Sequence, residues 1–407
     1  MIFRSRRLDG PVDLNDVCRG DGMLFVRDGV GAAGRGVSIA TDEAGIADVL
    51  NELVPVAGSA IPPHGHGPQL FCRVPFLPGQ PADAFLPRLT VTKDAEGNAW
   101  ATISGRSEDD ATEVALADAL AEAFGATQPA PRAASFRVSP GTPVEDYLAA
   151  VTAARDAVRS GRLAKAVIAR DIVVESDEPI DVHAVLLRLR ASFGRSHRFC
   201  IDGLIGASPE LLVQVDGRTV RSHPLAGTAP RTGDPETDSR LAAELVASTK
   251  NQVEHRVVID MVHDTLLPRC SYLDWEPEPS IVTVANVQHL GTSIEGALSE
   301  PRPPVMDLVR DLCPTPALGG HPGNEAVEFI RSVEKTERGH YGGAVGLLDT
   351  HGNGTFAVTI RCAVLSADRR TARLFAGGGI VADSEPLAEL AETQAKFQAM
   401  LSALVRP

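Results

Sequence analysis

Residues 341–377 read YGGAVGLLDTHGNGTFAVTIRCAVLSADRRTARLFAG, and this stretch decides the fold class. Two apolar runs, 341–349 and 355–365, flank the tetrapeptide HGNG, whose glycine and asparagine residues accept the positive φ angles of a tight turn. The two runs therefore predict a β-hairpin. A third run at 373–377 predicts another strand with no helix in between. Strands that follow one another directly favour antiparallel pairing over strand–helix alternation.

The rest of the chain groups its helices between strands, which predicts an α+β fold with mainly antiparallel sheets. Spacing and composition predict further strands at 23–27, 70–76, 99–104, 164–174, 198–202, 211–215, 219–223 and 281–287. They predict helices at 108–124, 144–160, 182–192, 234–267, 304–312 and 324–334. Residues 126–140 are rich in Ala, Pro and Ser and predict a connection. We expect an N-terminal region, 1–140, within the same fold as a catalytic region, 141–407.

Composition limits the classes of function. The 407 residues can bury a large core, and a formal net charge of −14 argues against nucleic acid or anionic membranes as main partners. No run of about 18 apolar residues predicts a membrane span. The six cysteines include no CxxC pair, which is typical of reduced thiols in a cytoplasmic protein. The N-terminal residues do not resemble a signal peptide.

Residues 375–396 read FAGGGIVADSEPLAELAETQAK and combine a glycine-rich strand end with a helix. Glu389, Glu392 and Lys396 have i, i+3, i+7 spacing and share one face of that helix. Two carboxylates suit a hard cation such as Mg²⁺, and the lysine suits an anionic ligand. Taken alone, the same face is more often a solvated ion-pair ladder.

Two ionisable residues lie in apolar surroundings. Lys165 shares a strand face with Val167 and Ala169, so burial would lower its pKa and make it a plausible base. A lysine at a strand end that reaches into water is the simpler alternative. Glu210, between the turn GASP and the strand LLVQV, would have a raised pKa and suit a general acid. Alternatively, the side chain of Glu210 caps the turn or forms hydrogen bonds with it.

Other segments supply candidate walls. Glu254 lies in a helical stretch and could face the pair in 375–396, or simply belong to a polar helix face. Gly227 leaves room for a ligand or fits a turn. The loop 313–320, CPTPALGG, is rigid and has little side-chain bulk. Arg361 is expected to point to the face opposite Ile360 and Cys362, where it could hold a carboxylate bidentately.

Seven segments in register resemble the chorismate-utilising enzymes, which include isochorismate, salicylate, anthranilate and aminodeoxychorismate synthases. The segments are KAVIAR at 165–170, ASPELL at 207–212, PLAGTA at 224–229, EH at 254–255, QHL at 288–290, TIRCA at 359–363, and GGGIVADS with ExxET and Lys396 at the end. This chain departs by having GGG where many relatives have GAG, and no tryptophan in AELAET. The resemblance implies a large sandwich of antiparallel sheets with flanking helices, the anthranilate synthase-like fold.

The resemblance also implies roles. Lys165 would activate water for attack at C2 of chorismate, and Glu210 would protonate the departing C4 hydroxyl. Glu254 and Glu392 would hold Mg²⁺, with Glu389 as a ligand or just behind it. The substrate would contact residues that anchor its carboxylates or shape the pocket: Gly227, His289, Ala317, Leu318, Arg361, Gly377 and Lys396.

Within the family, PTPALGG at 314–320 resembles the isochorismate synthases, which isomerise chorismate to isochorismate. A salicylate synthase, which goes on to eliminate pyruvate, also carries the lysine and remains the nearest alternative. An aminating anthranilate or aminodeoxychorismate synthase component is a further alternative, and a non-enzymatic binding protein is another. We expect a cytoplasmic monomer whose product feeds menaquinone, catechol siderophore or salicylate synthesis.

Overall fold

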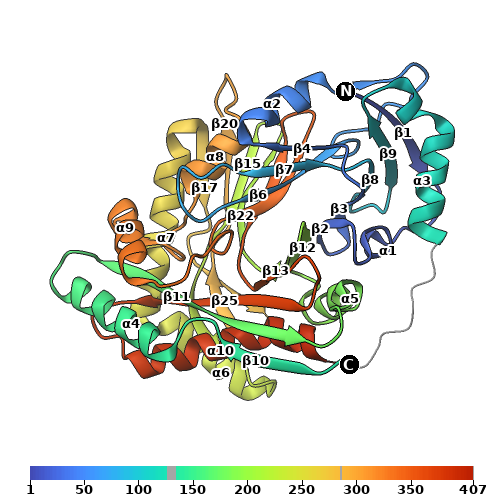
Figure 1. Cartoon of the computed structure of the whole chain (residues 1–407). Coiled ribbons are helices and arrows are strands. Elements are labelled where there is room, and N and C mark those ends of the chain that lie inside the picture. The colour runs from blue at the N-terminus through green and yellow to red at the C-terminus, as the bar shows by residue number, and fades with distance from the viewer. Residues whose placement is uncertain (126–133, 285–286, 407) are drawn as a thin grey trace.

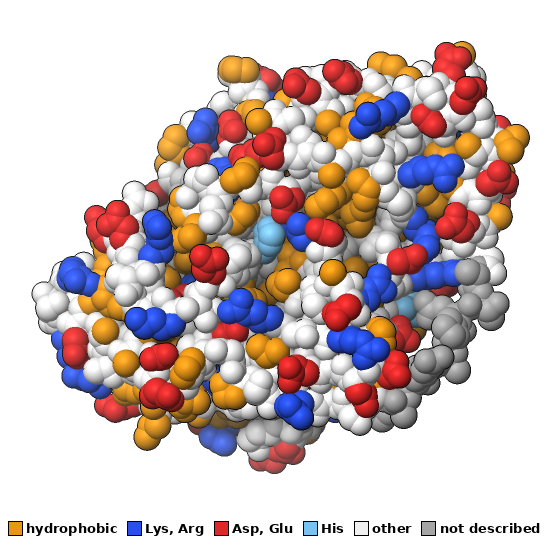
Figure 2. Space-filling model, viewed as in Figure 1, with side chains coloured by type: hydrophobic (Ala, Val, Ile, Leu, Met, Phe, Trp, Pro, Cys, Tyr) orange, Lys and Arg blue, Asp and Glu red, His pale blue; other side chains and the backbone are white. Residues whose placement is uncertain are grey.

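The computed structural model describes residues 1–125, 134–284 and 287–406, and within them the chain forms two large β-sheets, a small third sheet and flanking helices (Figure 1). All strand pairs are antiparallel except β1 with β5. The α+β fold with mainly antiparallel sheets is thus confirmed. Figure 2 shows acidic and basic side chains interspersed over one face of the molecule.

The larger sheet contains thirteen strands within the described residues. In spatial order they are β10 (Phe136–Pro140), β11 (Lys165–Ser176), β25 (Thr371–Ile380), β24 (Cys362–Leu365), β13 (Leu204–Ser208), β12 (His197–Ile201), β2 (Met23–Arg27), β3 (Val30–Arg35), β8 (Leu89–Lys93), β9 (Ala99–Gly105), β1 (Ile2–Leu8) and β5 (Val54–Pro55), with β21 (Gly320–His321) paired to β11.

The second sheet has nine strands among the described residues: β17 (Cys270–Trp275), β20 (Ile294–Leu298), β15 (Thr219–His223), β14 (Leu211–Asp216), β23 (Gly354–Val358), β22 (Ala344–Asp349), β6 (Gln69–Val74), β7 (Asp83–Leu86) and β4 (Ile39–Asp42). The third consists of β16 (Leu225–Pro230), β19 (Val287–Gly291) and β18 (Ser280–Val284). Segments before residue 126 therefore contribute strands to both large sheets.

The helices cover the sheets and include α1 (Leu14–Cys18), α2 (Glu43–Glu52), α3 (Glu113–Gly125), α4 (Val144–Arg159), α5 (Val182–Phe193), α6 (Pro235–Ala247), α7 (Thr249–Leu266), α8 (Val305–Leu312), α9 (Gly323–Val333) and α10 (Pro386–Val405). One apolar cluster joins the two large sheets through Phe71, Phe199 and Phe356. A second lies between the larger sheet and helices such as α5 and α10, with Leu189 and Phe397. These two clusters hold the layers together.

The hairpin predicted from HGNG is confirmed, since Ala344 pairs with Val358 and Leu348 with Gly354. The expectation of one strand over 355–365 is wrong. Strand β23 ends at Val358 in the second sheet, and β24 begins at Cys362 in the larger one. Between them Arg361 has a φ of 51°, a left-handed conformation that turns the chain from one sheet into the other.

Three further expectations need correction. The single helix at 234–267 is two helices, because Ser248 has an extended backbone and its side chain caps α7 by accepting from the N–H of Asn251. The strand at 281–287 is divided between β18 and β19; residues 285–286 lie outside the described residues. The connection at 126–140 ends in strand β10, which pairs with β11, while 126–133 lie outside the described residues.

In the described parts of the chain no helix combines the length and apolarity needed to cross a bilayer. All six cysteines are free, four of them buried and two, Cys270 and Cys313, half-buried.

Candidate active site

A cavity of about 310 Å³ lies where β11, β25, α7, α10 and the small third sheet meet. Every candidate residue singled out from the sequence lines it: Lys165, Glu210, Gly227, Glu254, His289, Ala317, Leu318, Arg361, Gly377, Glu389, Glu392 and Lys396. These residues come from segments more than 200 positions apart, so the fold gathers them. All the residues that line the cavity lie after position 164.

Lys165 opens strand β11 and lies against the triple glycine of β25. Val167 pairs with Gly379, and a Cβ atom at position 379 would come within 2.5 Å of the Cε atom of Lys165. The bare glycine therefore makes the space that the lysine occupies. Burial lowers the pKa of Lys165; Glu254 partly offsets this and Lys396 adds to it. The lysine is therefore easier to deprotonate than a lysine in water.

Glu210 lies between strands β13 and β14 at the other side of the cavity. Its side chain is buried, with 3% of the residue exposed, and its Oε1 atom has no hydrogen-bond partner among the described residues. Burial raises the pKa of Glu210 to about 8, although a hydrogen bond from the Leu225 backbone and the charge of Lys165 act in the opposite direction. The carboxyl group is therefore largely protonated at neutral pH and can donate a proton.

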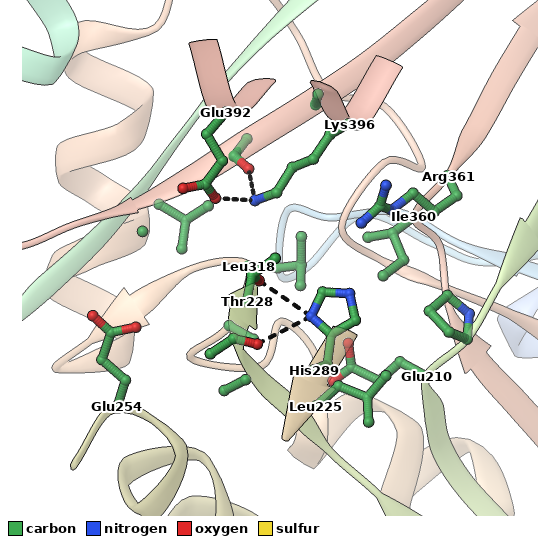
Figure 3. A pocket seen from close by; sticks show the side chains of 18 of the residues that line it. Glu210, Leu225, Thr228, Glu254, His289, Leu318, Ile360, Arg361, Glu392 and Lys396 are labelled. Atoms are coloured by element: carbon green, nitrogen blue, oxygen red, sulfur yellow. Dashed lines mark hydrogen bonds and ion pairs between the residues drawn. The ribbon is translucent and has the colours of Figure 1, made fainter. Parts of the chain in front are cut away.

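Helix α10 brings the charged face expected from the sequence into the cavity (Figure 3). The Nζ atom of Lys396 lies 2.7 Å from Oε1 of Glu392 and donates to the carbonyl of Gly377 at 2.7 Å. Burial would raise the pKa of Glu392, but the hydrogen bond and charge of Lys396, together with the charge of Lys250, lower it by more. Glu389 accepts a hydrogen bond from the hydroxyl of Ser384 at 2.7 Å, and burial raises its pKa.

Helix α7 forms the facing wall with Lys250, Asn251 and Glu254. Figure 3 shows Glu254 pointing into the cavity from the wall opposite Glu392. Its carboxylate has no hydrogen-bonded or ion-paired partner in the described ranges. Gly227 has a φ of 72°, and a Cβ there would lie 3.2 Å from Asn251. Gly227 therefore allows α7 to approach strand β16 closely.

Arg361 enters the cavity from the turn between β23 and β24 and is 9% exposed. Ile360 lines the cavity too, so the expectation that the two side chains face opposite ways is wrong. The left-handed conformation of Arg361 breaks the alternation of an extended strand. Among the described residues no carboxylate lies within ion-pair distance of its guanidinium. A buried cation without a protein counter-ion suits an anionic ligand.

His289, on strand β19, is held in one tautomer. Its Nδ1 atom lies 3.1 Å from the carbonyl of Gly227 and 3.1 Å from the hydroxyl of Thr228 (Figure 3). Because a carbonyl only accepts, Nδ1 carries the proton and Nε2 keeps its lone pair. Burial, with help from Arg361, lowers the pKa of His289 to about 3, so the ring is neutral.

The loop 314–320 forms a further wall of the cavity. The N–H groups of Leu318 and Gly319 both donate to the carbonyl of Thr315, which closes a tight turn. Strand β21 then pairs His321 with Lys165, so the loop and the lysine share one piece of sheet. Ala317 and Leu318 present apolar side chains to the cavity.

The donor set fits Mg²⁺ rather than a transition metal. Glu254 and Glu392 offer carboxylate oxygens from two walls, and Mg²⁺ commonly uses one or two carboxylates with water and ligand oxygens. Glu389 is already bonded to Ser384. Within the described residues no three His, Cys, Asp or Glu side chains form a ready-made metal cluster. The two carboxylates would therefore need oxygen atoms from a ligand.

Several residues that line the cavity were not predicted from the sequence. Tyr341 lies inside the predicted hairpin, yet its ring stacks on Phe375 at 5.4 Å and lines the cavity. Lys250 is four residues before Glu254 in α7, and this i, i+4 spacing was a usable signal. For Tyr341 no local pattern exists, because its position depends on the pairing of distant strands.

The chain is similar to known proteins over most of its length. Residues 41–405 match a family model described as "Chorismate binding enzyme". The isochorismate synthase MenF of Bacillus subtilis is 38% identical over 331 residues, 79% of this chain and 69% of that protein. The isochorismate synthase DhbC of the same organism is 40% identical over 281 residues, 66% of this chain and 70% of that protein. The structure of Escherichia coli MenF superposes with a TM-score of 0.84 at 24% identity, over 99% of this chain and 95% of that one, and supports the fold.

Proposed function

Because this chain belongs to the family of chorismate binding enzymes, we propose that it is an isochorismate synthase, an isomerase that interconverts chorismate and isochorismate. The observation that carries the proposal is the pairing of opposite pKa shifts in one cavity. Lys165 has a lowered pKa, and Glu210 has a pKa raised to about 8. A base and an acid prepared in this way can act on the same substrate at neutral pH.

The reaction replaces the hydroxyl group at C4 of the ring by a new one at C2. Neutral Lys165 takes a proton from water as the water oxygen bonds to C2, and the ring double bond shifts. The bond between C4 and its hydroxyl oxygen then breaks, and Glu210 donates the proton that turns this oxygen into water. Atoms and charge balance, because one water enters, one water leaves, and Lys165 returns its proton to Glu210 through solvent.

The substrate is a dicarboxylate, and the cavity offers cations for it. Arg361 has no protein carboxylate within ion-pair distance among the described residues, and its fork can bind one substrate carboxylate bidentately. Lys396, which also lines the cavity, is fixed by Glu392 and the carbonyl of Gly377. Neutral His289 presents Nε2 as an acceptor, while Gly227, Gly377, Ala317 and Leu318 shape the space around the ring.

Mg²⁺ is the proposed cofactor, with Glu254 and Glu392 as its protein ligands and Glu389 close by. The ion supplies electrostatic stabilisation to a substrate carboxylate when bound. The lowered pKa of Glu392 keeps this group ionised and ready for a cation.

Two other reactions are separated by their products. A salicylate synthase would release one pyruvate for each chorismate consumed, and an aminating synthase would form an aromatic amine only with ammonia. Incubation with chorismate and Mg²⁺, with and without ammonia, followed by chromatography and a lactate dehydrogenase assay for pyruvate, tests all three. We expect isochorismate without stoichiometric pyruvate; pyruvate formed in step with chorismate loss would overturn the proposal.

The proposal also covers the compartment, the oligomeric state and the use of the product. We expect a cytoplasmic monomer, on the basis of the family resemblance and the composition. MenF and DhbC are both named as isochorismate synthases. Their similarity to this chain therefore supports isochorismate formation as its reaction. The product would serve menaquinone or catechol siderophore synthesis.

A further inference from the structure

A buried ion pair lies directly behind the cavity. Glu334 follows helix α9, and Arg338 lies in the turn before β22; their side chains are 5% and 2% exposed. The Nε atom of Arg338 donates to Oε2 of Glu334 at 2.9 Å, and its Nη2 atom donates to Oε1. Two parallel bonds fix the guanidinium plane. The reaction proposed above assigns neither residue a role.

The same pair holds two walls of the cavity. The Nη1 atom of Arg338 donates to the carbonyl of Leu318 at 2.8 Å, and Nη2 donates to the carbonyl of Val167 at 2.6 Å. Oε1 of Glu334 accepts from the N–H of Ala169 at 2.7 Å. Val167 and Leu318 both line the cavity. One buried pair is thus bonded to the strand of Lys165 and to the loop that faces it.

Neighbouring contacts stiffen this arrangement. The guanidinium of Arg338 lies 4.2 Å from the ring centre of Phe76 and 6.0 Å from that of Tyr341. The N–H of Val167 donates to the carbonyl of Gly319 at 3.0 Å, next to the carbonyl that Arg338 holds. The end of the loop is thus joined to the strand by backbone hydrogen bonds, and Arg338 adds a side-chain link at Leu318.

We propose that Glu334 and Arg338 are positioning residues that fix the loop 314–320 against the strand of Lys165 and limit the contact of that lysine with bulk solvent. The inference rests on the proposed function, because it assigns the pair a part in that reaction. A displacement of about 1 Å in a reacting group costs roughly 100-fold in rate. If the loop moved away, bulk solvent would hydrate Lys165 more fully and its pKa would rise toward the ordinary value.

The variants separate positioning from folding. Arg338→Met leaves Glu334 buried without its counter-ion and lowers the thermal midpoint. The double variant Arg338→Met/Glu334→Gln contains no buried charge, keeps an acceptor for the Ala169 N–H, and recovers most of the thermal midpoint. We expect its kcat/KM to remain about 10- to 100-fold below the wild type. We also expect the acid limb of its pH profile to shift to higher pH.

A matched control is available in Arg73. This arginine also pairs with carboxylates, Asp83 and Asp202, donates to a carbonyl and lies over a ring, Phe85, but none of these residues lines the cavity. Arg73→Met should lower the thermal midpoint without moving the pH profile. A double variant whose kcat/KM and acid limb recover together with its stability would overturn the proposal.

Hydrogen exchange gives a readout that does not depend on turnover. In the double variant, peptides that cover 165–169 and 314–320 should exchange faster than in the wild type, while peptides around Arg73 stay unchanged. Unchanged exchange in both peptides would overturn the positioning role. A wild-type enzyme that forms no isochorismate would instead overturn the proposed function, and the exchange result would still decide the role of the pair.

Discussion

The side chain of Lys165 lies against Gly379, where a Cβ atom would come within 2.5 Å of Cε and 3.0 Å of Nζ. Gly379→Ala should therefore push the lysine out of place and lower kcat by about 10- to 100-fold. Thermal stability should change little, because the end of a flexible side chain gives way. Steady-state kinetics with chorismate and a melting curve measure both effects. Gly323→Ala is the control, since a Cβ there meets nothing within 4 Å.

Glu210 makes stability depend on pH in a defined direction. Its pKa in the folded protein is about 8, above the ordinary 4.5. Between these values the folded state keeps a proton that the unfolded chain releases, so stability falls as pH rises from about 4.5 to about 8. Glu210→Gln removes this dependence. The free energy of unfolding of the variant relative to wild type should rise by a few kcal/mol between pH 5 and pH 8.5.

Denaturant titrations at the two pH values measure this difference. Glu210→Gln should also reduce kcat by about 10²- to 10⁴-fold, because the proton donor is lost. A relative stability that stays constant across this range would contradict the raised pKa of Glu210.

The magnesium ligands can be tested by binding. Glu254→Gln and Glu392→Gln should each weaken Mg²⁺ binding by roughly ten-fold or more, since each removes a carboxylate that a hard cation prefers. Calorimetric titration of Mg²⁺ in the presence of chorismate measures the change. Glu244→Gln is the control, because Glu244 is exposed on α6 and paired with Arg240. Unaltered Mg²⁺ affinity in both cavity variants would leave the helix face of α10 as a simple ion-pair ladder.

Arg361 should act on substrate affinity. Arg361→Lys keeps the charge but loses the planar fork, so KM for chorismate should rise by about ten-fold or more. Arg218→Lys, an exposed change in the turn between β14 and β15, should leave KM unchanged. Equal KM values for the wild type and Arg361→Lys would exclude bidentate binding of a carboxylate at this position.

The sequence predicted the fold class and much of the site because local signals were strong. The HGNG turn specified a hairpin, and seven short segments in register carried the family resemblance. Every candidate residue from those segments lines one cavity. The local pattern failed at Arg361, where a left-handed residue carries the chain from one sheet to the other. Such a turn depends on the packing of both sheets, which no local periodicity records.

Long-range contacts explain why other features of the structure were not predicted from the sequence. Arg338 donates hydrogen bonds to the backbone carbonyls of Val167 and Leu318. Every residue has such a carbonyl, so the pattern of side chains does not indicate these contacts. Ser248 divides a continuous helical pattern because its side chain caps α7, which helical periodicity alone does not reveal.

The most direct measurement of the central claim is the reaction in H₂¹⁸O. Attack by water activated by Lys165 predicts isochorismate with one ¹⁸O atom in the C2 hydroxyl group, without stoichiometric pyruvate. Mass spectrometry and NMR of the isolated product determine the position of the label. Isochorismate without ¹⁸O at C2, or pyruvate released in step with chorismate consumption, would contradict the account.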